Sequence, residues 1–354
     1  MQHRYFAASN SAEGFKNYYP QVFKRADRLY IIKGGPGTGK SCFMKRFADK
    51  MQVLGCAVEY YYCSSDPSSL DGVLVVGKGE TVGMLDGTPP HTFDPVFPGV
   101  REEIINLGQF WNSELLQNEK TEIFALNQKK SAAFERAYSY LRSCGNLRAV
   151  TDSLLQKVIK EEKMRSAVER MAQSLSLPKG EATIIPSIRC SVGMTGTVCF
   201  DSFESRAGKT FFVSDFYGIG QIFLGELLKF LKETRSVIRV SYDPISPGRI
   251  DGIFIEDAQI AFVLSKKIED GTDGVGHVNP KRFVDGEKIR SVRGEVRYAA
   301  RLFDDCLEGA LHSLSAARVY HFVLEDIYKK AMDFATLSAY SKSFNEKEEE
   351  RMMR

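Results

Sequence analysis

One glycine-rich segment near the start of the chain holds the residues with the clearest chemical meaning. It reads Gly34-Gly35-Pro36-Gly37-Thr38-Gly39-Lys40-Ser41-Cys42. This run contains the pattern G-x-x-x-x-G-K-[ST] of a phosphate-binding loop, or P-loop, in which backbone N–H groups surround phosphate oxygens. We expect residues 34–42 to bind a nucleoside triphosphate. Lys40 should reach the β- and γ-phosphates, and the Ser41 hydroxyl should ligate Mg²⁺.

The residues on both sides of this loop predict the elements that would hold it. Leu29-Tyr30-Ile31-Ile32 is an apolar run typical of a buried strand. Behind the loop, apolar residues recur at helical spacing, at Phe43, Met44, Phe47 and Met51. The positive end of that helix dipole would face the phosphates. We therefore predict a strand, the loop and a helix in this order.

A weak internal repeat suggests that the core is duplicated. Residues 29–41 align with residues 210–222, and the two glycines after Pro36 find glycine partners. In this alignment Lys40 matches Gln221, which has no ammonium group, and Asp215 brings a carboxylate to the place of the phosphate. We therefore predict that the second copy is degenerate and has a structural or regulatory role.

The same alignment sorts the acidic residues of the first copy. Two of them find an acidic partner in the second copy: Asp66 with Asp243, and Asp71 with Asp251. Asp86, at the end of an apolar strand, finds Ser265 or Lys266 instead. An acid lost together with the lysine is expected to serve the nucleotide and its metal. We therefore predict that Asp86 is a catalytic Mg²⁺-binding acid beside Lys40 and Ser41.

Two further side chains have alternative interpretations. Asp66 follows the second strand, where it could accept a proton from a substrate hydroxyl in a small-molecule kinase, or it could shape a turn before Pro67. His91 could position a phosphate or a water, with a surface histidine as the default. The sequence has no N-K-x-D motif for guanine, so ATP is the expected nucleotide.

The composition is that of an ordinary globular chain. It has 354 residues, 43% hydrophobic and 26% charged, with a net charge of +3 that does not indicate a nucleic-acid partner. Neither a membrane span nor a signal peptide is apparent, so we expect a cytoplasmic protein. Seven cysteines without a C-x-x-C pair predict reduced thiols rather than disulfides or a zinc site.

The helical patterns and the repeat together give a domain plan. We predict an α/β protein with two tandem P-loop-like α/β/α cores and mainly parallel sheets, each followed by a helical segment. The expected ranges are 1–177 (core 1–100, helices 101–177) and 178–354 (core 181–275, helices 285–345). Within these ranges we expect helical structure at residues 103–107, one helix over 153–177 and a short helix near residues 6–15.

The chain resembles a family of uncharacterised bacterial P-loop ATPases built from two tandem P-loop-like halves. The resemblance covers nearly the whole chain and rests on Arg4 to Ala7, Ile32 to Ser41, Cys63 to Gly72, Leu85 to His91 and Ile104 to Gly108. It implies ATP binding and a doubly wound P-loop fold, and it indicates no substrate.

Three functions remain open from the sequence. The first is Mg²⁺-dependent ATP hydrolysis at the N-terminal site, with the second copy or an unknown partner responding to the nucleotide. The second is a small-molecule kinase that uses Asp66 as base. The third is an ATP-sensing module without hydrolysis.

Overall fold

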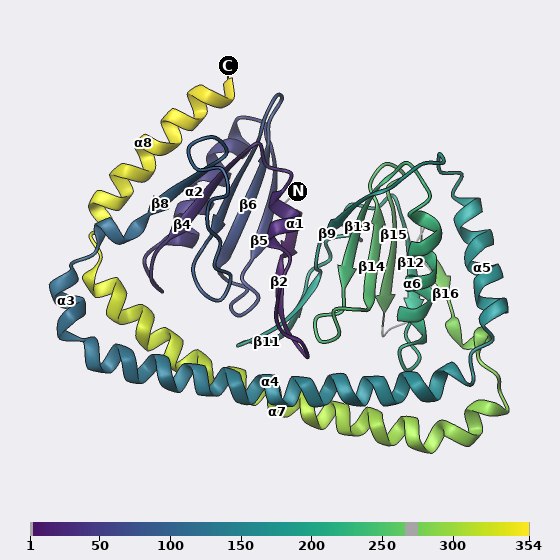
Figure 1. Cartoon of the computed structure of the whole chain (residues 1–354). Helices are drawn as coiled ribbons and strands as arrows, with labels where there is room; N and C mark the ends of the chain where they lie inside the picture. Colours follow the sequence, from purple (N-terminus) through teal and green to yellow (C-terminus); the bar gives the residue numbers. More distant parts are fainter. Residues whose placement is uncertain (1–2, 266–274, 354) are drawn as a thin grey trace.

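The computed structural model describes residues 3–265 and 275–353, and it consists of two lobes joined by long helices (Figure 1). A six-stranded β-sheet forms the centre of each lobe. The first sheet, in the order β1-β5-β6-β7-β4-β8, comprises β1 His3–Phe6, β4 Arg28–Lys33, β5 Ala57–Tyr62, β6 Leu70–Val76, β7 Thr81–Asp86 and β8 Glu102–Asn106. The second, in the order β16-β12-β15-β14-β13-β9, comprises β9 Thr183–Pro186, β12 Lys209–Ser214, β13 Val237–Tyr242, β14 Ile250–Ile255, β15 Ile260–Ser265 and β16 Val275–Val278.

Both sheets have the same topology, which supports the predicted duplication. Read from its β9 edge, the second sheet repeats the order of the first strand by strand. The strand directions agree too, with three parallel and two antiparallel pairings in each sheet. The protein is therefore α/β with two mixed sheets, and the prediction of mainly parallel sheets is not confirmed.

In each lobe, a helix that follows the central strand covers one face of the sheet. Helix α2 (Lys40–Val53) buries Phe43, Met44, Phe47 and Met51, the residues whose spacing predicted it. Helix α6 (Ile219–Leu231) occupies the matching place in the second lobe. On the other face of the first sheet, α1 (Tyr19–Phe23) packs in a cluster that also contains Phe254, Ala261 and Val263 of the second sheet. The two lobes therefore share a hydrophobic core.

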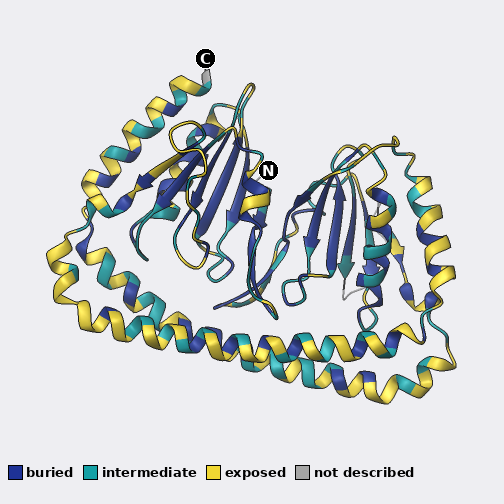
Figure 2. Cartoon of the chain, in the orientation of Figure 1, coloured by how far each residue is buried: buried dark blue, intermediate teal, exposed yellow. Residues whose placement is uncertain are grey.

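Two long helices run side by side beneath both lobes (Figure 1). Helix α4 (Lys120–Gln156) follows the short α3 (Ser113–Asn118), and α7 (Lys288–Ala331) returns alongside α4. Small and aliphatic side chains, such as Ala137, Leu141 and Ala310, are buried between them. The outward faces stay exposed, as Figure 2 shows in yellow. We call this antiparallel pair the helical hairpin, although its two helices are not consecutive in the chain.

The helices that follow the helical hairpin cross between the halves of the sequence. Helix α8 (Phe334–Met353) packs against α2, where Phe344 contacts the rings of Phe43 and Phe47. Helix α5 (Glu161–Ser174) packs against α6 of the second lobe through Met164 and Val168. The hydrophobic clusters therefore do not follow the predicted halves 1–177 and 178–354.

Several local predictions need correction. Residues 102–106 form the edge strand β8 rather than a helix, so the first core extends past residue 100. The expected helix over 153–177 is divided between the end of α4 and α5. Residues 6–15 contribute to a β-hairpin of β2 (Ala8–Ser11) and β3 (Gly14–Asn17), not to a helix. Two short 3₁₀ helices, Leu107–Phe110 and Pro280–Phe283, follow the edge strands β8 and β16.

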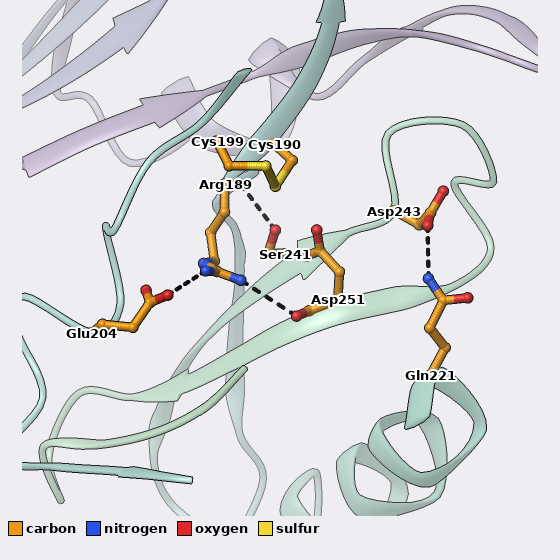
Figure 3. The surroundings of a disulfide bond; sticks show 8 residues. All are labelled: Arg189, Cys190, Cys199, Glu204, Gln221, Ser241, Asp243 and Asp251. Atoms are coloured by element: carbon orange, nitrogen blue, oxygen red, sulfur yellow. Dashed lines mark hydrogen bonds and ion pairs between the residues drawn. A yellow bond between two sulfur atoms is a disulfide. The ribbon is translucent and has the colours of Figure 1, made fainter. Parts of the chain in front are cut away.

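The prediction that all thiols are reduced is wrong for one pair. Cys190 and Cys199 form a disulfide across the hairpin of β10 (Cys190–Gly193) and β11 (Gly196–Cys199) (Figure 3). They are direct cross-strand partners with their Cα atoms 4.1 Å apart. That proximity depends on the hairpin register, which the spacing of the cysteines did not reveal. The other five cysteines are free.

The edges of the two sheets meet where β1 approaches β9. Phe6 pairs with Ile188 in an isolated antiparallel bridge, and Glu59 forms a buried ion pair with Arg239 across the boundary. Among the described residues, no helix has the length and apolar character needed to cross a membrane.

Candidate functional site

The glycine-rich loop lies where the sequence predicted it, between the inner strand β4 and the first turn of α2. Gly37 and Gly39 adopt φ angles of +69° and +88°, in the left-handed region that favours glycine. Gly39 is the residue directly before the helix, so its conformation turns the chain into α2.

Helices of the C-terminal half lie directly against this loop. A Cβ atom at Gly35 would lie 2.6 Å from the Tyr328 ring, and one at Gly37 would lie 2.6 Å from the Glu325 carbonyl oxygen. Both contacts come from α7. The absence of side chains at Gly35 and Gly37 therefore lets α7 approach the loop closely, a role that sequence reasoning missed.

The side chains of the loop are held by its own backbone and by β6. Lys40 Nζ donates to the carbonyl oxygens of Gly35 at 2.7 Å and Gly34 at 3.2 Å. The Ser41 hydroxyl accepts a hydrogen bond from the backbone N–H of Leu70 at 2.9 Å. Both side chains are therefore held at the N-terminal end of α2.

A cavity of about 920 Å³ opens above the loop. Residues 34–42 form one wall, and residues 63–66 and 88–91 form parts of the sides. The helical hairpin forms a further wall, with Lys130 and Tyr138 on α4 and with Glu325 on α7, which also touches the loop. Its volume lies at the upper end of the range for small-molecule sites, so it exceeds what a phosphate chain alone would fill.

Asp86 is buried in this cavity close to Lys40. It is the last residue of β7, as predicted, and its Oδ2 lies 3.5 Å from Lys40 Nζ. Its Oδ1 accepts hydrogen bonds from the backbone N–H and the hydroxyl of Thr88. Burial raises the pKa of Asp86 above its ordinary value, although the nearby Lys40 ammonium opposes that shift.

Two residues that the sequence did not assign to the site join Asp86. Asp71, Asp86 and His91 are all buried, and one ligand atom of each lies within 4.8 Å of the others. His91 Nε2 lies 3.1 Å from Asp71 Oδ2, whereas its Nδ1 is buried without a partner among the described residues. His91 is thus not the surface histidine of the default interpretation.

Asp71 and His91 shift each other's pKa. Burial opposes the charge of both groups, but their mutual attraction outweighs it, so the pKa of Asp71 is lowered and that of His91 is raised. The three side chains offer carboxylate oxygens and an imidazole, which suit a divalent cation. Asp71 was missed because its acidic partner Asp251 in the second copy favoured a turn-forming role.

The strand registers correct the internal alignment. Tyr62 and Tyr242 occupy the same bulged position at the ends of β5 and β13, and equally long loops follow them. Asp66 therefore matches Ser246, not Asp243, and the short insertion of the sequence alignment is not needed. Asp66 lines the cavity, and its Oδ1 accepts hydrogen bonds from the N–H and hydroxyl groups of Ser68.

The counterpart of Asp86 is Leu264, because Asp86 pairs with Ile32 just as Leu264 pairs with Val213. The prediction of Ser265 or Lys266 is therefore wrong, and Lys266 itself lies outside the described residues. The prediction that the second copy lacks an acid matching Asp86 is unchanged, since Leu264 has no carboxylate.

The second copy fills its own loop with protein groups. Asp215 Oδ1 accepts the backbone N–H of Gly220 at 3.1 Å, so a carboxylate takes the place that a phosphate oxygen would occupy in the first copy. Gln221, which replaces Lys40, donates to Asp243 at 2.6 Å (Figure 3) and accepts from Arg249 at 2.7 Å. These contacts agree with the prediction that this copy does not bind triphosphate, which stays a prediction.

Comparisons with protein-family models, curated proteins and solved structures found no match to this chain. The resemblance to tandem P-loop ATPases therefore stays a prediction, as do the roles of the individual residues in binding and catalysis.

Proposed function

We propose that this protein binds ATP with Mg²⁺ at the N-terminal loop and hydrolyses ATP there, while the C-terminal lobe has a structural or regulatory role. The observation that carries the proposal is the position of residues 34–41 between β4 and α2, with the Lys40 ammonium 3.5 Å from the buried Asp86. An anion nest, a cation and an acid then face one cavity, and a nucleotide with its metal needs all three.

The donor set fits Mg²⁺. Ser41 and Asp86 offer the hard oxygen ligands that this ion prefers, and Asp71 and His91 stand within reach of Asp86. When bound, the ion would neutralise part of the charge on the phosphates. Lys40 would leave the loop carbonyls for the β- and γ-phosphates, and the N–H groups of the loop would hold the remaining oxygens.

The helical hairpin supports a regulatory role for the second lobe. Tyr328 and Glu325 of α7 touch the loop, and Arg148 of α4 lies 3.4 Å from Gln221 in the degenerate copy. The same pair of helices therefore contacts both loops. A ligand in the first loop would change the contacts of α7 and so the relation between the lobes.

Turnover measurements test this proposal. Wild-type protein should release phosphate from ATP over many cycles, and only with Mg²⁺ present. Lys40→Met and Asp86→Asn should each lower the rate by about 100-fold or more, as expected for charged groups at a phosphoryl-transfer site. Gln221→Met, at the matching position of the second copy, is the control and should leave turnover unchanged. Equal turnover in wild type and Lys40→Met would contradict hydrolysis at this site.

A second candidate function is a small-molecule kinase. Asp66 lines the cavity, and the corrected alignment gives it no acidic counterpart in the degenerate copy, so it now satisfies the criterion that favoured Asp86. The cavity volume also leaves room for an acceptor. A screen of nucleosides, sugars and small alcohols would support this function if an acceptor speeds ATP consumption in wild type but not in Asp66→Asn. Nucleotide binding without any turnover would instead favour the ATP-sensing alternative.

A further inference from the structure

The wall that α4 contributes to the cavity contains a lysine, Lys130, that has no partner among the described residues. Lys130 projects from α4 into the cavity and is partly buried there. It has no hydrogen bond or ion pair within residues 3–265 and 275–353. Glu135 lies further along the same helix and is exposed, and it forms no ion pair with Lys130. Burial lowers the pKa of Lys130 below its ordinary value.

Every other cationic side chain at the cavity already has a partner. Lys329 pairs with Glu325 at 2.9 Å, and His321 lies 3.4 Å from the same carboxylate. His91 is held by Asp71, and Lys40 by the carbonyl oxygens of its own loop. Lys130 is therefore the cation of this wall that a ligand would have to compensate.

Arginine side chains do not take this role in the part of the chain that the structure describes, since none lines the cavity. Arg101 is bound to Glu102 and to the backbone carbonyls of Phe23 and Ala26. Arg148, on α4, lies beside Asp243 and Gln221 of the second lobe. In some P-loop enzymes a cation from outside the loop stabilises the charge on the γ-phosphate. Lys130 lines the same cavity as the loop and could supply such a cation.

We propose that Lys130 binds the γ-phosphate of ATP across the cavity from Lys40, so that the nucleotide connects the loop to the helical hairpin. This inference rests on the proposed ATP site and adds the residue that distinguishes ATP from ADP. The γ-phosphate would act as the counter-ion that Lys130 lacks among the described residues. The hairpin would thereby sense the γ-phosphate directly through α4.

Calorimetric titrations of ATP and ADP into Lys130→Met test the proposal. Losing a charged hydrogen bond of the usual strength should make the affinity of Lys130→Met for ATP about 10- to 100-fold weaker. Affinity for ADP should stay within about twofold of wild type, because ADP has no γ-phosphate. Lys130→Arg should restore most of the affinity for ATP. Lys129→Met, which removes an exposed lysine from the next position of α4, is the control and should change neither titration.

The melting temperature without nucleotide checks that the variant folds. Lys130→Met should melt at or above the wild-type temperature, since it removes an uncompensated cation. An unchanged affinity for ATP, or equal losses for ATP and ADP, would overturn the role of Lys130 while the ATP site stands. Failure of the wild-type protein to bind either nucleotide would instead overturn the proposed function itself, and this inference with it.

Discussion

Glu59 forms a buried ion pair between the two lobes, and its replacement by glutamine should lower the free energy of unfolding of the whole protein. The Glu59 carboxylate, 5% exposed, faces Arg239, which is 2% exposed and comes from the other lobe. Arg25 adds two hydrogen bonds of 3.0 Å each. Glu59→Gln removes the carboxylate that Arg25 and Arg239 share and leaves Arg239 with Glu256 as its remaining counter-ion. Breaking a buried pair in this way costs about 3–5 kcal/mol.

This cost converts into a measurable shift in melting temperature. The lobes share a hydrophobic cluster, so they should unfold together. An unfolding entropy of about 2.1 cal/mol/K per residue gives about 0.74 kcal/mol/K for this chain, so the melting temperature should fall by about 4–7 °C at pH 7. The Arg4–Asp201 pair also crosses between the lobes but is exposed. Asp201→Asn should cost about 0.2–1 kcal/mol and is the matched control.

The stability that the ion pair contributes should depend on pH through the ionisation of the Glu59 carboxylate. Burial would raise the pKa of Glu59, but Arg239 and Arg25 outweigh burial and hold that pKa well below its ordinary value. A lowered pKa gives stability that is present above the unfolded-state pKa of about 4.3 and is lost as the pH falls toward the folded-state value. The gap between wild type and Glu59→Gln, followed by thermal melts from pH 7 to pH 3, should therefore narrow at acid pH. Equal melting temperatures for Glu59→Gln and Asp201→Asn at pH 7 would refute the reasoning.

Two further predictions concern the loop and the thiols. Gly37→Ala should abolish ATP binding in calorimetry and destabilise the fold by about 1–3 kcal/mol, because φ is +69° there and the added methyl would meet the Glu325 carbonyl; wild-type affinity in this variant would contradict the described loop geometry. Thiol titration of denatured, unreduced protein should count five free thiols, rising to seven after reduction, because Cys190 and Cys199 are bonded; seven thiols before reduction would contradict the disulfide.

The sequence predicted the parts of the site that are close together in the chain. The glycine pattern, the apolar run before it and the helical spacing of Phe43 and Phe47 placed the loop between β4 and α2 without any long-range information. Asp86 could be placed at the end of a strand for the same reason.

The remaining features depend on contacts between distant segments. Asp71 meets Asp86 and His91 only through the register of β6 with β7 and the fold of the loop behind them. Lys130 reaches the cavity only because α4 passes under the first lobe. The helical pattern of residues 334–353 gave no sign that α8 packs on the opposite half of the chain. The mismatch of Asp66 arose because a short gap shifted the alignment by three residues, which only the strand pairing could correct.

The central claim is that the first copy of the core binds triphosphate and the second does not. Titration of ATP with Mg²⁺ into wild type, Lys40→Ala and Gln221→Ala, followed by calorimetry, tests it most directly because the two substitutions occupy matching positions. We predict one binding site per chain, an affinity at least about 100-fold weaker in Lys40→Ala, and wild-type affinity in Gln221→Ala. Two sites per chain, or equal affinity in wild type and Lys40→Ala, would contradict the account.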